Sequence, residues 1–141
     1  LYLIGTMNAA DRSTAGLDQA LRRRFSFVDM PPDAAVLAAW LEAHPPADAD
    51  EAFGPRVVRW FEELNRRLAR EVGADRQVGH SFFMVPGLTR AGLLAVWDHH
   101  VRPVLEEWFP GRPDRVAAFG PEKLLGEAGR GKNTQRLEQP W

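Results

Sequence analysis

Near its start the chain groups polar and cationic side chains whose types and spacing could act on a phosphate or a water molecule. Asn8, Asp11 and Arg12 form a polar elbow shortly after the apolar run 1–4. An asparagine can orient a water molecule or a phosphate oxygen by hydrogen bonds without adding charge. The adjacent cations Arg22 to Arg24 suit the C-terminal end of a helix dipole, but they repel one another unless an anion lies close. These residues are the first candidates for a site.

Two strands and a helix are predicted to position these side chains. The run 1–4 is apolar throughout, which is typical of a strand buried on both faces of a parallel sheet. Ligands bind outside the carboxyl ends of such strands, so the elbow lies where a site is expected. Apolar residues in 17–21 predict a helix that ends in the arginines, and 25–30 predicts a second strand. Pro31 and Pro32 end that strand and mark a joint between subdomains.

Beyond this joint the sequence predicts helices. Asp33 is a good N-cap for the first, and Pro55, at a first helical position, opens a long second helix that stops at Gly73. Thr89 can cap a third, in which Pro103 predicts a kink. The side chains expected to face inward are Val36, Leu37, Trp40 and Leu41 in the first helix, Val57, Phe61, Leu64, Leu68 and Val72 in the second, and Leu93, Leu94, Trp97, Val101, Val104, Leu105 and Trp108 in the third.

The outer face of the long helix is charged. Its pairs Glu62–Arg66 and Glu63–Arg67 have the favourable i,i+4 spacing, and we interpret this face as solvated rather than as a binding patch. Further along, 115–125 could add a short helix, and 126–141 has the composition of a flexible tail.

His80 leaves two interpretations open. It lies in the short aromatic stretch 77–85, next to Ser81 and two phenylalanines. A histidine in such surroundings is often a core or junction residue, and the alternative is a ligand-binding role.

The adjacent His99 and His100 point about 100° apart on a helix, so they do not share a face, and no metal site is predicted.

Composition excludes several classes of function. The 141 residues are 45% apolar and 26% charged, with a net charge of −1, so no global field favours nucleic acid. Cysteine is absent, which removes thiol chemistry and fits a reducing compartment such as the cytoplasm. No apolar run approaches the roughly 20 residues of a membrane span.

The segments GTMNAADRS and LDQALRRRF together resemble AAA+ nucleotide hydrolases of the McrB type, the motor subunits of 5-methylcytosine-specific restriction systems. QVGHSFFM and RPVLEEWF continue the resemblance, which covers about 1–109. It implies that Asn8 is the sensor-1 residue, with Asp11 and Arg12 completing the motif. It also implies that Arg22, Arg23 and Arg24 supply an arginine finger, with Arg23 the preferred candidate.

Three further residues take implied roles from the same resemblance. Asp18 matches the acidic residue that precedes the finger segment. His80 and Ser81 fall in the family pattern G-H-S-[YF]-F, which faces the nucleotide of the same subunit.

The resemblance divides the chain into an edge of the AAA+ α/β core (1–31), an α-helical lid subdomain (32–125) and the tail (126–141), with a mostly α composition overall. No G-x-x-x-x-G-K-[ST] motif and no strand ending in Asp-Glu occur, so the sequence lacks both Walker motifs. We therefore expect the C-terminal part of a longer protein, inactive by itself.

The implied parent is a hydrolase of GTP or ATP with Mg²⁺, working as a ring of identical subunits, a hexamer in this family. It would have a nuclease subunit as partner and would contact DNA through parts outside this sequence. No association with a membrane is expected. Two alternatives stay open: an ATP-dependent remodelling or chaperone motor, and a non-hydrolysing interaction module.

Overall fold

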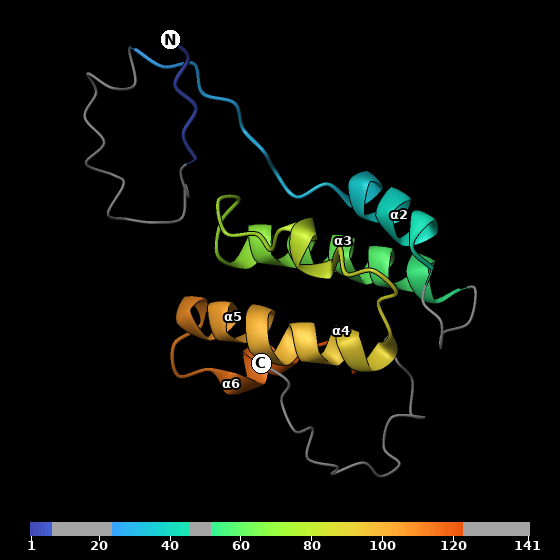
Figure 1. Cartoon of the computed structure of the whole chain (residues 1–141). Helices are drawn as coiled ribbons and strands as arrows, with labels where there is room; N and C mark the ends of the chain where they lie inside the picture. Colours follow the sequence, from blue (N-terminus) through green and yellow to red (C-terminus); the bar gives the residue numbers. More distant parts are fainter. Residues whose placement is uncertain (7–23, 46–51, 123–141) are drawn as a thin grey trace, which may run out of the picture.

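The computed structural model describes residues 1–6, 24–45 and 52–122, and the regular structure in these ranges is helical. In chain order the elements are α2 (Ala34–Ala43), α3 (Phe53–Glu71), the 3-10 helix η2 (His80–Phe83), α4 (Arg90–Val96), the π-helix η3 (Trp97–Val101), α5 (Arg102–Trp108) and α6 (Pro113–Ala117). Helix α3 lies between α2 on one side and the rod formed by α4, η3 and α5 on the other (Figure 1). The described part of the chain is therefore mostly α, as predicted.

Helix α2 begins where the sequence predicts. The Asp33 carboxylate accepts hydrogen bonds from the backbone N–H groups of Ala35 and Val36, at 2.7 and 3.3 Å, and so satisfies two donors of the first turn. Leu37 and Leu41 are buried, as expected. The prediction was wrong for Val36, which is 41% exposed because it lies at the edge of the apolar stripe.

Helix α3 supplies the largest share of the core. Its buried apolar side chains recur at helical spacing, as predicted, and include Phe53 and Phe61. The helix begins at Phe53, two residues before the predicted start at Pro55. The early start is allowed because the first backbone N–H groups of any helix have no acceptor within it, so Pro55 removes no bond there. After the last helical residue, Gly73 has a φ of +107°, which confirms the predicted stop.

The third predicted helix is a rod with a widened turn. Thr89 caps it by accepting a hydrogen bond from the Gly92 N–H at 3.0 Å. The π-helix η3 precedes Pro103, and within it the Arg102 N–H bonds to the Trp97 carbonyl. A proline ring crowds the carbonyl four residues earlier, and a wider turn relieves that contact. The predicted kink at Pro103 therefore takes the form of a π-helical turn.

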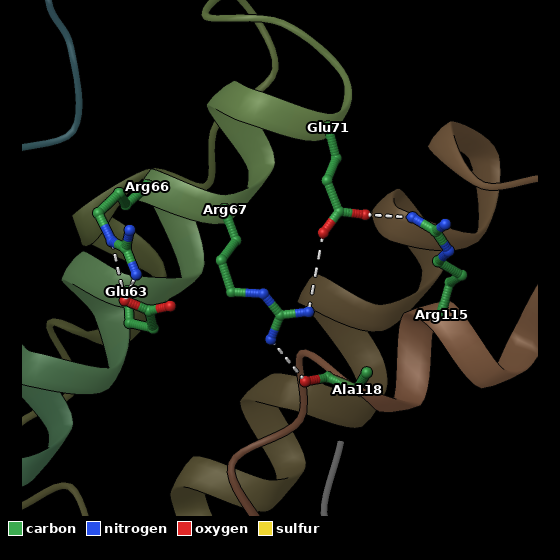
Figure 2. Close-up of polar contacts among 6 residues, drawn as sticks. All are labelled: Glu63, Arg66, Arg67, Glu71, Arg115 and Ala118. Carbon is green, nitrogen blue, oxygen red and sulfur yellow. Dashed lines mark hydrogen bonds and ion pairs between the residues drawn. The ribbon is translucent and has the colours of Figure 1, made fainter.

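Side chains of α3 bind the turn after α6 through contacts that no sequence pattern predicts (Figure 2). Arg67 donates a hydrogen bond to the Ala118 carbonyl at 2.9 Å, and its guanidinium lies 4.2 Å from the ring centroid of Phe119. Trp60 Nε1 donates to the Phe119 carbonyl at 3.0 Å. Arg115 of α6 pairs with Glu71 at 2.7 Å. Val116 and Phe119 are buried, so α6 closes the core.

One hydrophobic core joins all of these elements. Its buried side chains run from Leu37 to Phe119 and come from every helix named above. The half-buried Trp60 of α3 packs against this core and contacts both Phe83 of η2 and Trp97 of η3 with its ring edge-on, with ring centroids 5.4 and 6.1 Å apart. The packing therefore fixes η2 directly onto α3.

The two predicted strands do not appear in the described residues. Residues 1–6 and 26–30 carry no regular structure, and Leu1, Tyr2, Leu3 and Ile4 are each at least 70% exposed. Phe27, Val28 and Met30 are also exposed. A strand forms only when neighbouring strands take up its backbone hydrogen bonds, and no described segment offers a sheet to these residues. The edge of an α/β core is therefore not seen here.

Candidate functional site

Most of the residues predicted to act on a nucleotide lie outside the described residues. These are Asn8, Asp11, Arg12, Asp18, Arg22 and Arg23. Arg24 is described and lies exposed in a turn immediately before 25–30. The geometry of the elbow and of the arginine cluster therefore stays a prediction, and the site that can be built from contacts is the one around His80.

His80 connects η2 to the beginning of α2. Its Nδ1 accepts a hydrogen bond of 3.0 Å from the backbone N–H of Asp33, which is distant in sequence. Because the backbone group donates, Nδ1 is the unprotonated nitrogen, and the neutral ring carries its proton on Nε2. Of the two interpretations left open by the sequence, this contact matches the junction histidine. A role beside a nucleotide stays a prediction.

Asn65 holds the segment that carries His80, and sequence reasoning missed it. Its Nδ2 donates to the Val78 carbonyl at 3.0 Å, and its Oδ1 accepts from the Val78 N–H at 2.7 Å. The side chain is 6% exposed, so both backbone groups of Val78 are satisfied inside the protein. One signal was available in the sequence: Asn65 is an amide beside Leu64 on the apolar side of α3, where the neighbouring inward positions are hydrocarbon.

The outer side of η2 carries the predicted binding residue Ser81 and an aromatic stack. Ser81 is exposed, and Phe82 is 40% exposed. The Phe82 ring stacks on His100 of η3, with centroids 6.2 Å apart and an interplanar angle of 26°. The turn thus divides its side chains, with Phe83 fully buried and Ser81 and Phe82 directed away from the core.

Electrostatics on the outer face of α3 are local. Glu63 accepts hydrogen bonds from the Arg66 guanidinium, and this contact, together with the charges of Arg66, Arg67 and Arg70, lowers the pKa of the Glu63 carboxyl from its ordinary value. The observed pairs are Glu63–Arg66 and Arg67–Glu71 rather than the predicted Glu62–Arg66 and Glu63–Arg67 (Figure 2). Arg67 does not pair with Glu63 because its guanidinium turns toward the Ala118 carbonyl (Figure 2).

The described residues contain neither a metal-binding cluster nor a membrane-spanning helix. No group of at least three histidine, aspartate or glutamate side chains there is placed to hold a metal ion. No helix in those ranges is both long enough and apolar enough to cross a bilayer.

The sequence of the helical part matches a known family of domains. Residues 56–117 fit the family described as McrB, alpha-helical lid domain, and they span α3 through α6. The chain therefore belongs to the class of proteins that contain an α-helical lid domain.

Comparison with curated proteins gives the particular family. The chain is 33% identical over 140 residues to the EcoKMcrB subunit of the type IV methyl-directed restriction enzyme of Escherichia coli strain K12. The match covers 91% of this chain and 29% of that relative, so the chain spans about three tenths of the relative's length. No solved structure matches significantly. The chain is of the McrB type, as its motifs predicted.

Proposed function

We propose that this chain is the C-terminal portion of a AAA+ nucleoside-triphosphate hydrolase that drives a DNA restriction endonuclease. One observation carries the proposal. The chain contains a helical lid of the McrB family at 56–117, and 91% of its length aligns with a subunit of a restriction enzyme. The motif order supports it further, because the elbow, the arginine cluster and the GHSFF segment precede and enter the lid in the order of the family.

The proposed chemistry is transfer of a phosphoryl group to water. Asn8 would orient the attacking water, with Asp11 and Arg12 shaping the elbow around it. Arg23, flanked by Arg22 and Arg24, would place positive charge beside the nucleotide of the neighbouring subunit in a ring, a hexamer by family analogy. An arginine supplied in this way typically raises the rate about 10³–10⁵-fold. GTP or ATP with Mg²⁺ would be held mainly by residues outside this sequence, because no Walker motif occurs in it.

The partners follow from the same proposal. A nuclease subunit would use the motor, DNA would be contacted through parts outside this sequence, and the protein would work in the cytoplasm. Asp18, His80 and Ser81 would lie near the nucleotide side of the joint between core and lid.

The test is phosphate release by the full-length protein, measured with GTP and with ATP in separate assays. Turnover with GTP alone supports a restriction motor of the McrB type, and turnover with ATP moves the assignment to a remodelling motor. Arg23→Ala is expected to reduce turnover by at least about 10³-fold without unfolding the protein.

Arg59→Ala is the matched control, because Arg59 is an exposed arginine on α3 and has no proposed role. It should leave turnover unchanged. Absence of turnover with both nucleotides, in a folded and assembled protein supplied with its partner subunit, would leave the non-hydrolysing interaction module instead.

A further inference from the structure

The contact between His80 and Asp33 lies at the point where the chain enters the helical domain. Asp33 follows Pro31 and Pro32, and neither proline has a backbone N–H. The Asp33 N–H is therefore the first backbone donor after the joint, and it is held by η2, 47 residues away in sequence. We infer that His80 is a positioning residue that latches the joint to the lid and fixes the direction in which 24–30 leaves it.

The acceptor in this latch is rigidly mounted. On one side of His80, Asn65 holds both backbone groups of Val78. On the other side, Phe83 is fully buried and packs edge-on against Trp60 and Phe61 of α3. Because η2 is fixed to the long helix at both ends, its imidazole has a defined position, and a backbone group that bonds to it acquires a defined position too.

The latch replaces a local contact that α2 lacks. In a capping box, a Glu or Gln at the third helical position accepts a hydrogen bond from the N-cap N–H. In α2 that position is Val36, which cannot accept one, while Asp33 uses its carboxylate for Ala35 and Val36. The N-cap N–H therefore takes its acceptor from a different element, and the helix start becomes coupled to the rest of the lid.

The two prolines extend the effect beyond Asp33. Each proline ring fixes φ near −65°, so the chain between Asp33 and 24–30 has few ways to turn. A hydrogen bond that fixes Asp33 therefore also favours one direction in which 24–30 leaves the helical domain. This inference concerns the described residues alone and does not depend on nucleotide hydrolysis.

A first experiment detects the latch directly in the full 141-residue chain. With ¹⁵N-labelled protein, we expect a scalar coupling across the hydrogen bond between the Asp33 amide nitrogen and an imidazole nitrogen of His80. Amide exchange at Asp33 should accelerate roughly 3- to 10-fold in His80→Phe, which keeps a ring and removes the acceptor. His80→Asn keeps an acceptor near the position of Nδ1 and should restore slow exchange. Absence of the coupling in the wild-type protein would overturn the latch without reliance on any variant.

A second experiment separates a latch from a mere helix cap. The chain has no cysteine, so Ser26→Cys and Glu62→Cys, both at exposed positions, provide two unique sites for spin labels. We expect a narrow distance distribution in the wild-type background and in His80→Asn, and a broad one in His80→Phe. Adding Val36→Glu to His80→Phe supplies a capping-box acceptor at a 41% exposed position, so it should stabilise α2 while the distribution stays broad.

Two results would overturn the inference. An unchanged distribution in His80→Phe would show that the exit direction does not depend on His80. A distribution that Val36→Glu makes narrow again would show that His80 acts only as a substitute cap for α2. Urea unfolding of each variant confirms that the compared proteins are folded.

Discussion

At the scale of single residues, Asn65 has the clearest energetic role. Its amide satisfies a buried backbone donor and a buried backbone acceptor of Val78 at once. Leucine at this position would keep the branched shape of the side chain and leave both groups unpaired, and an unpaired buried polar group costs about 1–3 kcal/mol. Asn65→Leu should therefore lower the free energy of unfolding by about 2–4 kcal/mol, measured by urea denaturation. Glu62→Ala, on the exposed face of the same helix, should change it by less than about 0.5 kcal/mol.

Glu63 gives a prediction about pH. Its pKa is lowered in the folded protein, so the folded state binds the proton less tightly than the unfolded chain does. The resulting stabilisation is present above the ordinary value of 4.5 and is lost as the pH falls through the lower folded pKa. The stability difference between wild type and Glu63→Gln should shrink over that interval. It should also be small at neutral pH and weaken with salt, since the carboxylate lies at the solvent-exposed surface. A difference that grows as the pH falls would contradict this assignment.

The residue scale also shows where sequence reasoning stops. The stripe Val57, Phe61, Leu64 and Leu68 is predictable because period 3.6 fixes one face of a helix. The partner of Arg67 is not predictable from the sequence. Its guanidinium can bond either to a nearby carboxylate or to the Ala118 carbonyl, which only folding brings close. His80 remained ambiguous for the same reason: its acceptor atom meets a donor 47 residues away.

At the scale of elements, helix ends were the most predictable features, since caps depend on local chemistry. Asp33, Gly73 and Thr89 each act as the sequence indicated. The strands expected at 1–4 and 25–30 could not be predicted in this way, because a strand depends on partner strands that lie elsewhere in a sheet. Pro103 predicted a disturbance of the rod, although its form as a π-helical turn depends on how the surrounding helices pack.

Gly73 provides the test at this scale. Its φ of +107° lies in a region that residues with a Cβ rarely adopt, so Gly73→Ala should destabilise the protein by about 1 kcal/mol or more. Gly54, near the start of the same helix, is a matched control, because an added Cβ would meet Leu41 at an ordinary 3.7 Å. Gly54→Ala should be neutral or stabilising by up to about 1 kcal/mol. Thermal unfolding measures the change in stability of each variant. Equal changes in the two variants would refute the role of Gly73 as a helix stop.

At the scale of the whole molecule, the core and the proposed chemistry belong to different parts of the chain. Among the described residues, the buried side chains of the hydrophobic core lie between Leu37 and Phe119, whereas Asn8 and Arg23 precede the proline joint. The described portion of 1–30 exposes most of its large apolar side chains instead of adding them to that core. Stability should therefore reside in the helical domain, and His80 should decide how the preceding segment is presented from it.

This division predicts that the helical domain folds by itself. A chain of residues 32–122 keeps every member of the core, the Asp33–His80 bond and the Arg67 contacts with Ala118 and Phe119. Its free energy of unfolding should lie within about 1 kcal/mol of that of the 141-residue chain, because this range contains the whole core from Leu37 to Phe119. Its solubility should increase as well, because exposed apolar residues such as Leu1, Ile4 and Met30 are removed. A loss of several kcal/mol in urea denaturation would mean that 1–31 or 123–141 contributes packing that the core from Leu37 to Phe119 does not contain.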